Sequence, residues 1–577
     1  MRFFTTICVA VTLVAQTTTA AAPKSATKYK QDSLPVVDLG YELHQALAYN
    51  ATTDIYKFSN IRYAQAPVDN LRFRAPLPPN TDRSTIQNGS AIRTCPQGVP
   101  DWQSKAFIPV ARFINGLPFT LEAWENAINA STPFPPSAFN GAVTEDCLFL
   151  DVHVPGKVLR KAQKSKKGSK GVPVLVWIHG GGYTLSSKIG HPTPGFDPSG
   201  ILAHAKQPHP QGNGEGMIFV SLNYRLGALG FLASPNDNSS APNTGLLDQR
   251  LALHWIQSHI YLFGGDPDRV TLMGESAGGG SIMFHISSYA AQGKPAPFKQ
   301  AILQSPAAMP VASAAAPREA AYAEFMALMN VSSLDEARRL ESEAVILANQ
   351  EQIRTAKGTS YVHGPVVDGD IVVGDLGRLF QPGGVVARKS GVKIMVGHNT
   401  FEGGFFFDPT VKTEGDFGQW LRWSVTGLED KQVTELMEVV YPPVFDGSHG
   451  YTGQGSRQMA LWGEGILDCN FVWTGEAMAG EVFAYEFGSP GLHTQDLKYT
   501  FNDPANPAFH KNMQDILQTA IASFVVNGKP VLKGGGAPTW PRWGMGQELV
   551  TINETVAAVG RSSVNETRCR WWQNRRL

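Results

Sequence analysis

Features that proteins use to bind metals, nucleic acids or membranes are scarce in this 577-residue sequence. It has only five cysteines and no C-x-x-C motif or Cys/His cluster, so neither a metal site nor a cofactor is expected. Lys plus Arg and Asp plus Glu both total 49, and this balance leaves no net field to attract nucleic acid or an anionic membrane. Beyond the N-terminus, no unbroken apolar run approaches the roughly 20 residues of a membrane-spanning helix. The expected partner is therefore a small molecule, and the sequence does not indicate an oligomeric state.

The N-terminus has the features of a secretory signal peptide. Arg2 supplies a positive charge, and residues 3–14 form an apolar run that is too short to span a membrane. Small residues follow at 20–22, where a signal peptidase would cut. We therefore predict that residues 1–22 are removed and that the mature chain is secreted.

The cysteines fit a secreted protein. Cys8 belongs to the predicted signal, and the four that remain are Cys95, Cys147, Cys469 and Cys569. Four cysteines allow three pairings. Closure of the shorter loop favours Cys95–Cys147 and leaves Cys469–Cys569, with buried free thiols as the alternative.

Sequons of the form N-x-S/T predict surface glycosylation in a eukaryotic host. They lie at Asn50, Asn88, Asn129, Asn238, Asn330, Asn553 and Asn565.

The spacing of apolar residues predicts an α/β fold. Strand-like apolar segments alternate with helical patterns, such as Leu247, Leu251 and Trp255 at four-residue steps. This alternation predicts a large, mostly parallel, twisted sheet flanked by helices, with small antiparallel strands near the N-terminus. The expected strands are 54–63, 147–154, 172–178, 217–224, 269–273, 301–303, 392–396 and 482–487, of which 482–487 is the last. Helices are expected at 279–287 and at 512–526, and the second of these closes the fold.

Two stretches interrupt this pattern. Residues 318–354 are charged and rich in Ala and Leu, which predicts a helical insertion within about 310–390. Residues 157–170 are basic and contain Gly and Ser, which predicts a solvated loop, with a polyanion contact as the alternative. The mature chain, 23–577, is thus predicted to form one domain.

The pentapeptide Gly274-Glu275-Ser276-Ala277-Gly278 fits G-x-S-x-G, a sharp strand-to-helix turn that exposes a nucleophilic serine. An apolar strand pattern precedes it and a helical pattern follows it, as such a turn requires. The following helix directs its N-terminal N–H groups and its positive dipole end toward the site. Ser276 is therefore the predicted nucleophile of an acyl-transfer reaction, and a chance Gly/Ser loop is the alternative.

A glycine-rich stretch, His179-Gly180-Gly181-Gly182, follows the predicted strand 172–178. Acyl transfer passes through a tetrahedral oxyanion, which backbone N–H groups stabilise by about 3–4 kcal/mol each. Glycine lets the main chain approach closely because it has no Cβ. We predict that the N–H groups of Gly181, Gly182 and Ala277 are the donors, and a plain glycine-rich turn is the alternative.

Further motifs extend over most of the chain. They are Asn60-Ile61-Arg62-Tyr63-Ala64 with Leu71-Arg72-Phe73, Glu145-Asp146-Cys147-Leu148-Phe149-Leu150-Asp151-Val152, Asn223-Tyr224-Arg225-Leu226-Gly227, Phe263-Gly264-Gly265-Asp266-Pro267 and Gly364-Pro365-Val366-Val367-Asp368-Gly369. As a set, they resemble the type-B carboxylesterase/lipase family, which includes cholinesterases and fungal lipases. The resemblance runs from about residue 54 to the C-terminus and implies the α/β-hydrolase fold.

The resemblance also implies a triad in the order Ser, Glu, His. The family's acid lies in a G-x-N-x-x-E-G context, which residues 397–403 match with Glu402 as the acid. Its histidine precedes an acidic-aliphatic pair and an aromatic residue, as His493 does. In such a triad His493 takes the proton of Ser276 and passes it to the leaving alcohol, while Glu402 fixes the tautomer of the ring and stabilises the imidazolium.

Other histidines and acids near these motifs are interpreted as packed or surface groups. His398 is set aside because it is too near Glu402 at the end of a strand, and two acids are expected on the surface. The groups set aside are His179, His254, His259, His398, His510, Asp408 and Asp496.

The chain departs from the family in its first disulfide loop. The Cys95–Cys147 interval is longer than the corresponding loop of cholinesterases, and no choline site is evident. The interval carries the apolar residues Trp102, Phe107, Ile108, Phe113, Ile114 and Phe119. Two interpretations remain open: a lid or gorge lining, and simple packing on the body of the protein.

These observations predict a secreted serine esterase that acts on carboxylic esters of apolar or aromatic small molecules through an acyl-enzyme on Ser276. A lipase, a feruloyl-type esterase and an esterase or acyl transferase of fungal secondary metabolism are alternatives within the same fold. An alternative of another class is a non-catalytic adhesion or binding protein, and the intact Ser276, Glu402 and His493 count against it.

Overall fold

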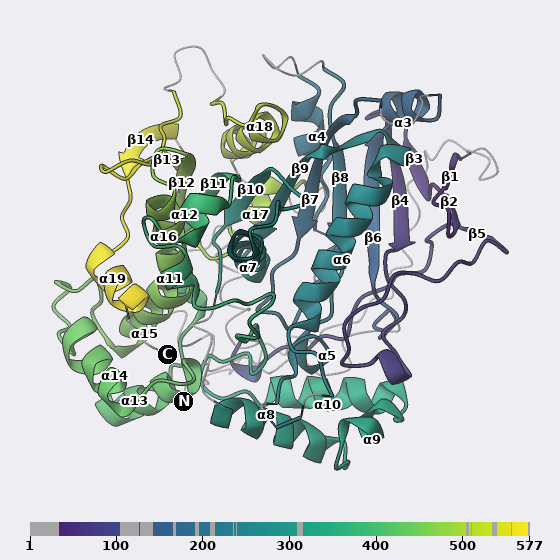
Figure 1. The fold of residues 1–577 in the computed structure, drawn as a ribbon. Helices are drawn as coiled ribbons and strands as arrows, with labels where there is room; N and C mark the ends of the chain where they lie inside the picture. Colours follow the sequence, from purple (N-terminus) through teal and green to yellow (C-terminus); the bar gives the residue numbers. More distant parts are fainter. Residues whose placement is uncertain are drawn as a thin grey trace, which may run out of the picture.

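The computed structural model describes most of the chain after the predicted signal peptide, which lies outside the described residues. The described residues are 34–574, without 104–125, 127–141, 165–168, 191–194, 208–213, 235, 238, 309–314, 504–506, 509, 533–538 and 555–556. Figure 1 shows a large twisted sheet with helices around it.

The strands form two sheets. They are β1 (Val36–Asp38), β2 (Leu43–Gln45), β3 (Ala48–Asn50), β4 (Ile55–Arg62), β5 (Ile86–Gln87), β6 (Phe149–Pro155), β7 (Val172–Ile178), β8 (Ile218–Leu222), β9 (Gly265–Glu275), β10 (Gln300–Gln304), β11 (Lys393–Phe401), β12 (Val482–Leu492), β13 (Glu548–Ile552) and β14 (Ala557–Arg561). The main sheet has 11 strands in the order β14-β13-β12-β11-β10-β9-β7-β8-β6-β4-β3. Its middle, from β8 to β13, is parallel, and the strands at both ends pair antiparallel. This confirms the predicted mostly parallel sheet.

A small sheet of the order β1-β2-β5 lies near the N-terminus. Its β1 and β2 pair antiparallel, as predicted, but β5 joins β2 in parallel.

The helices are α3 (Gly156–Ala162), α4 (Ser199–Ala205), α5 (Gly227–Phe231), α6 (Thr244–His259), α7 (Ala277–Gln292), α8 (Ala315–Leu328), α9 (Leu334–Arg338), α10 (Ser342–Arg354), α11 (Leu376–Leu379), α12 (Val385–Lys389), α13 (Glu414–Ser424), α14 (Asp430–Glu435), α15 (Gln454–Gly463), α16 (Cys469–Ala477), α17 (Leu497–Thr500), α18 (Lys511–Asn527) and α19 (Glu566–Asn574). Short 3-10 turns are η2 (Asp69–Leu71), η4 (Ile260–Phe263) and η5 (Glu402–Phe405), and π-helical turns are η6 (Leu436–Val440) and η7 (Glu464–Asp468).

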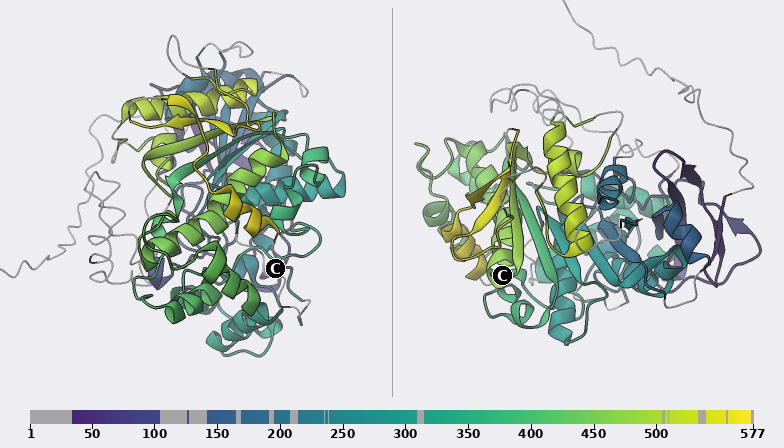
Figure 2. Two further views of the ribbon diagram at one scale, coloured as in Figure 1. Left: turned by 90° about the vertical axis from the view of Figure 1, so that its left-hand side faces the viewer. Right: turned by 90° about the horizontal axis from the view of Figure 1, so that it is seen from above.

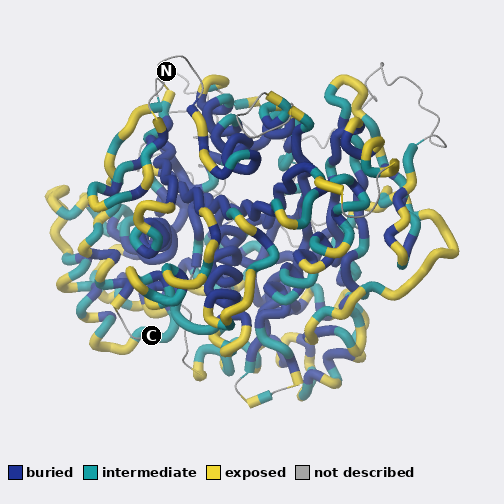
Figure 3. Tube along the Cα trace, turned by 45° about the horizontal axis from the view of Figure 1, so that its top comes forward, coloured by how far each residue is buried: buried dark blue, intermediate teal, exposed yellow. Residues whose placement is uncertain are grey.

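The main sheet separates two apolar cores. Successive side chains of a strand point to opposite faces, so in β7 Val174 and Val176 pack on one side while Leu175 and Trp177 pack on the other. Helices α6 and α7 cover the first face, and α4 and α18 cover the second (Figure 2). The strands are buried on both faces, which explains their continuous apolar sequences. Figure 3 shows the buried residues concentrated in this centre and the exposed ones around it.

The predicted insertion consists of helices. Residues from α8, α9 and α10 form a third apolar cluster, in which Phe325, Leu334 and Val345 pack together with Leu229 of α5. In Figure 1 these helices lie at the end of the sheet where its parallel strands finish. They therefore stand beside the region in which an α/β sheet places its ligand site.

The C-terminal part of the fold differs from the prediction. The last strand is not 482–487, because β13 and β14 follow α18 and extend the sheet, and α19 closes the chain. The five-residue segment Glu548–Ile552 is too short and too mixed in polarity to be distinguished from a loop by its sequence pattern alone.

Two disulfides join the cysteines in the pairs that the sequence favours. Cys95 is bonded to Cys147, and Cys469 at the start of α16 is bonded to Cys569 in α19. Across the described ranges, no helix combines the length and apolar character needed to traverse a bilayer.

Candidate active site

Three residues that are far apart in the sequence meet at the ends of parallel strands. Ser276 follows β9, Glu402 follows β11 and His493 follows β12. The Nε2 atom of His493 lies 3.0 Å from Oγ of Ser276, and its Nδ1 atom lies 2.6 Å from Oε2 of Glu402. All three residues are at least nine-tenths buried. The structure thus brings together the three residues of the predicted triad in hydrogen-bonding order.

The turn that carries Ser276 is strained and closely packed. Ser276 has φ 54° and ψ −124°, a conformation that an L-residue rarely adopts. A Cβ on Gly278 would lie 2.1 Å from the carbonyl oxygen of Ile178, so only glycine fits there. The carbonyl of Ser276 accepts hydrogen bonds from the N–H groups of Gly280 and Ala307, which hold the turn. The residue pattern G-x-S-x-G therefore has a direct steric cause.

The glycine-rich stretch lies against Ser276, because a Cβ on Gly180 would lie 2.9 Å from Cβ of Ser276. Gly181 and Gly182 have φ of 101° and 59°, and the carbonyl of Gly181 accepts hydrogen bonds from the N–H groups of Thr184 and Leu185. A Cβ on Gly182 would lie 2.4 Å from the ring of Tyr361. Gly182 and Ala277 line the same small cavity as Ser276, so two of the three predicted N–H donors border it directly.

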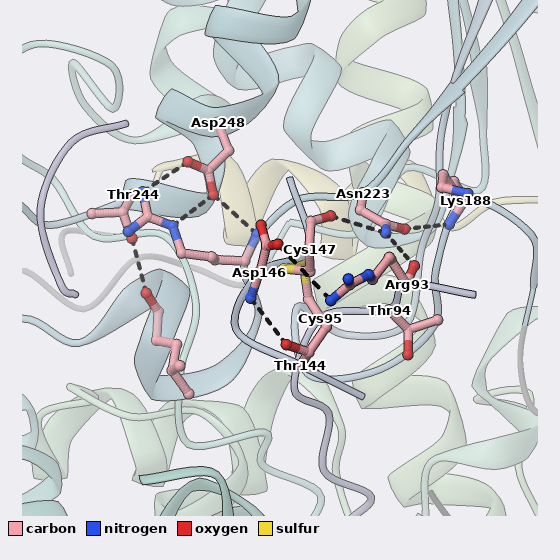
Figure 4. The surroundings of a disulfide bond; sticks show 12 residues. Arg93, Thr94, Cys95, Thr144, Asp146, Cys147, Lys188, Asn223, Thr244 and Asp248 are labelled. Carbon is pink, nitrogen blue, oxygen red and sulfur yellow. Dashed lines mark hydrogen bonds and ion pairs between the residues drawn. A yellow bond between two sulfur atoms is a disulfide. The ribbon is translucent and has the colours of Figure 1, made fainter. Parts of the chain in front are cut away.

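The base of the first disulfide loop is tied to the segment that follows the glycines. The amide nitrogen of the Asn223 side chain donates to the carbonyls of Arg93 and Cys147, and its oxygen accepts from the N–H of Lys188 (Figure 4). The N–H of Ser186 donates to the Gln97 side chain. Movement of this loop base would therefore disturb the glycine turn.

Buried charges set the protonation of the triad. Burial would raise the pKa of Glu402, but the His493 ring and the N–H of Asn399 outweigh it and hold the pKa below its ordinary value. Burial would lower the pKa of His493, but the charges of Glu275 and Glu402 outweigh it and raise the pKa to about 9. This arrangement stabilises an imidazolium, as a general base requires once it has taken a proton.

Glu275 is a further member of the site, to which the sequence pattern assigns no role. It is 2% exposed, and its Oε1 atom lies 3.4 Å from Nε2 of His493, on the side of Ser276. Burial raises the pKa of Glu275 to about 8, although His493 works against this. Its position directly before the nucleophile was the available signal, but G-x-S-x-G leaves that position open.

The prediction that Asp496 is a surface group is wrong. Asp496 is fully buried, and its carboxylate accepts hydrogen bonds from Tyr485 at 2.9 Å and from the side chain of Gln304 at 2.9 Å. Asn399 connects this network to the triad, because its backbone N–H donates to Oε1 of Glu402 at 2.6 Å. Asp496 follows His493 by three residues, and a loop sequence does not reveal that its side chain is buried.

The cavity in front of Ser276 is small and largely apolar, and aromatic rings form part of its wall. It encloses about 40 Å³, and its walls include Tyr361, Phe406, Trp462 and His363. The rings of Phe406 and Trp462 stack with centroids 3.7 Å apart. These packed rings border the space in front of Ser276.

One residue of the disulfide loop reaches this wall. Trp102 contacts the ring of Tyr361 edge-on at 5.3 Å and that of Phe406 at 6.0 Å, and its Nε1 donates to the carbonyl of Ser360. The other apolar residues of this interval, Phe107, Ile108, Phe113, Ile114 and Phe119, lie outside the described residues, so both interpretations of the interval stay predictions.

Among the described residues, the other histidines interpreted as packed or surface groups form no hydrogen bond or ion pair with the triad, and one of them lies close to it. His254 and His259 are on α6, His510 precedes α18, and the ring of His179 stacks on Tyr224 at 4.4 Å. The close one is His398, of which a ring nitrogen lies within 4.8 Å of a carboxylate oxygen of Glu402.

His398, Glu402 and Asp468 form the group of possible metal ligands among the described residues, with one ligand atom of each within 4.8 Å of the others. The donor chemistry does not fit a metal, because a ligating histidine must be neutral. His398 lies between the carboxylates of Asp468 and Glu486, which favour its protonated form. We therefore assign the positive charge of this group to the imidazolium.

Comparison with known proteins places the site in a family. The model of the carboxylesterase family matches residues 45–572. The chain belongs to this family. Carboxylesterase patB of Aspergillus clavatus is 36% identical over 548 residues, which cover 94% of this chain and 96% of that protein. The protein is therefore a carboxylic ester hydrolase.

Two further comparisons are with a solved structure over most of the chain and with a relative over a part of it. The crystal structure of Aspergillus niger EstA matches with a TM-score of 0.72 at 24% identity, and the match covers 94% of this carboxylesterase and 98% of EstA. This likeness confirms the predicted α/β-hydrolase fold. A secreted lipase of Arthroderma benhamiae is 45% identical over 168 residues, which cover 29% of this chain and 30% of the lipase.

Proposed function

We propose that this carboxylesterase is a secreted enzyme that hydrolyses esters of apolar or aromatic small molecules through an acyl-enzyme on Ser276. The observation that carries the proposal is the pair of hydrogen bonds at His493, 3.0 Å to Ser276 and 2.6 Å to Glu402. An imidazole held in this way can take a proton on one nitrogen while a carboxylate compensates the charge at the other.

Acylation follows from these contacts. Oγ of Ser276 attacks the ester carbonyl and gives its proton to Nε2 of His493. The carbonyl oxygen becomes an oxyanion, and we assign the N–H groups of Gly181, Gly182 and Ala277 as its donors. The C–O bond of the ester then breaks, and the leaving alkoxide takes the proton from His493.

Deacylation repeats the same steps with water. His493 takes a proton from the water as its oxygen attacks the acyl carbon, and it returns that proton to Oγ of Ser276 as the acyl bond breaks. The carboxylic acid leaves and the enzyme is restored. The chemistry requires no cofactor.

The walls of the cavity support a substrate with a short acyl group. The space of about 40 Å³ is closed by Tyr361, Phe406 and Trp462, all of which are at most 8% exposed. A long acyl chain would have to displace these packed rings, which costs free energy in a dense interior. Apolar and aromatic groups gain contact with the same rings.

Several features support passage through the secretory pathway. The signal-like residues 1–22 precede two disulfides, which persist in oxidising compartments. The sequon residues Asn50, Asn88, Asn330 and Asn565 are exposed and Asn553 is half-buried, while Asn129 and Asn238 lie outside the described residues. We propose that residues 23–577 form the mature domain.

The test is hydrolysis of p-nitrophenyl acetate, butyrate and octanoate by the wild type and by Ser276→Ala. We expect kcat/KM to fall as the acyl chain lengthens. The Ser276→Ala variant should lose roughly four orders of magnitude in kcat, as other triad deletions do.

The matched control is Ser287→Ala. Ser287 is also fully buried and lies on α7, but its hydroxyl donates to the carbonyl of Phe284 and, among the described residues, bonds to no member of the triad. This variant should keep wild-type activity. Retention of most activity by Ser276→Ala would refute the nucleophile, whereas a preference for octanoate would refute only the short acyl group and favour a lipase.

A further inference from the structure

A second buried histidine lies behind the catalytic acid. His398 is 1% exposed on β11, four positions before Glu402. Its Nδ1 lies 3.1 Å from Oδ1 of Asp468, and its Nε2 lies 3.3 Å from Oε2 of Glu486. The imidazole is thus held between two carboxylates that come from η7 and β12.

His398 and Asp468 lie close to Glu402 of the triad. A ring nitrogen of His398 and one carboxylate oxygen each of Glu402 and Asp468 all lie within 4.8 Å of one another. The three residues also border one cavity of about 840 Å³, which is distinct from the small cavity at Ser276 and His493. Glu402 therefore has the reaction site on one side and a charged group on the other.

The charged groups that face His398 are negative. It faces the carboxylates of Asp468, Glu486 and Glu402, while its ring packs on the uncharged Phe471 at 4.3 Å. Beyond them, the cavity is lined by His449 and by the ion pair of Glu464 with Arg568, whose Oε1 and Nη1 atoms lie 3.0 Å apart. The imidazolium is therefore the positive charge in contact with Asp468.

The acidity of these groups agrees with this arrangement. Burial would lower the pKa of His398, but Asp468 and Glu486 outweigh it and raise the pKa to about 10. Burial raises the pKa of Asp468 to about 6, although His398 opposes this. Without a positive neighbour, the pKa of Asp468 would rise further, and above that pKa its carboxylate would be an uncompensated buried charge beside Glu402.

We propose that His398 is a positioning residue for the catalytic acid. Its imidazolium compensates the negative charges of Asp468 and Glu486, so that Glu402 is the carboxylate that stabilises the charge on His493. The inference rests on the proposed roles of Ser276, Glu402 and His493. Loss of the imidazolium would leave additional negative charge behind Glu402. That charge would favour the protonated form of His493, so the neutral base would be present only at higher pH.

The experiment measures kcat/KM for p-nitrophenyl acetate against pH in His398→Gln. We expect the acid-side inflection to move up by about one pH unit, the scale of effect of a single nearby buried charge. Activity at pH 7 should fall about tenfold, with the loss in kcat and with KM within about twofold of the wild type.

Two more variants keep the test open if His398→Gln folds poorly. Asp468→Asn removes a negative charge near Glu402, so its inflection should move to lower pH. In the double variant His398→Gln/Asp468→Asn both charges are gone, and the inflection should return to near the wild-type value. A merely structural role for His398 would predict no such opposite shifts.

His44→Gln is the matched control. His44 is also fully buried, and its Nδ1 lies 2.9 Å from a carboxylate oxygen of Glu42 in the small N-terminal sheet. We expect this variant to melt at a lower temperature with an unchanged inflection. An inflection that stays at the wild-type pH in both His398→Gln and Asp468→Asn would overturn the proposal.

Two further measurements distinguish a positioning role for His398 from a metal site and from a failure of the proposed function. Dialysis of the wild type against EDTA should leave the profile unchanged, and a shift that mimics His398→Gln would mean that the group holds a metal instead. Activity retained in Ser276→Ala would remove the proposed function itself, whereas failure of the His398 variants alone would leave that function intact.

Discussion

At the scale of single residues, the proposed mechanism makes the charge on His493 determine how the enzyme responds to pH. The base is active when neutral, and the charges of Glu275 and Glu402 raise its pKa to about 9. A raised pKa means that His493 stays protonated to a higher pH. The rate should therefore increase with pH through an inflection above the ordinary histidine value of about 6.5.

The pH profile of kcat/KM reports this inflection in the free enzyme. Glu275→Gln removes the acidic neighbour at 3.4 Å and should move the inflection to lower pH. An inflection at or below the ordinary histidine value in the wild type, or no displacement in Glu275→Gln, would show that Glu275 does not carry the charge assigned to it.

The residues that the sequence identified are those with rigid local patterns. Ser276 lies in a turn that only glycines on both sides permit, and Glu402 and His493 were found through resemblance to a family. Asp496 was misjudged because its burial depends on partners such as Tyr485 and Gln304, which come from other strands. A single sequence does not show which distant polar groups will be buried together.

At the scale of elements, the long apolar strands were predictable and the terminal additions were not. The segment 172–178 has apolar residues throughout because β7 is buried on both faces, so its bounds agree with the prediction. By contrast, β13 and β14 are five-residue strands at the edge of the sheet, where burial is partial and the pattern is weak.

The C-terminal helix α19 depends on its disulfide. Cys569 is joined to Cys469 across 100 residues, and the nearby Trp572 donates to the hydroxyl of Tyr441 at 3.0 Å. Removing a crosslink that closes so long a loop increases the entropy of the unfolded chain. Cys569→Ser should lower the free energy of unfolding by about 2–4 kcal/mol.

Denaturant unfolding of Cys569→Ser measures this loss. The kcat on p-nitrophenyl acetate at low temperature should change little, because neither cysteine takes part in the hydrogen bonds that join Ser276, Glu402 and His493. Treatment of the wild type with a reductant under native conditions is the companion measurement. An unchanged midpoint in the variant would show that packing alone holds α19.

At the scale of the whole molecule, the prediction concerns secretion. When the full gene is expressed in a secreting eukaryotic host, the enzyme should appear in the medium with residue 23 as its first residue. Treatment with an N-glycosidase should reduce its mass, and peptides with Asn50, Asn88, Asn330 or Asn565 should carry the modification. Retention inside the cell with residues 1–22 attached would contradict the proposed secretion.

The proposed chemistry depends on Ser276 as the residue that forms a bond with the substrate. Its most direct test is labelling of the intact enzyme with a fluorophosphonate, followed by peptide mass spectrometry. We predict one label per chain, on Ser276, with none in Ser276→Ala and strongly reduced labelling in His493→Ala. A label on another residue, or full ester hydrolysis by an enzyme that takes no label, would contradict the central claim.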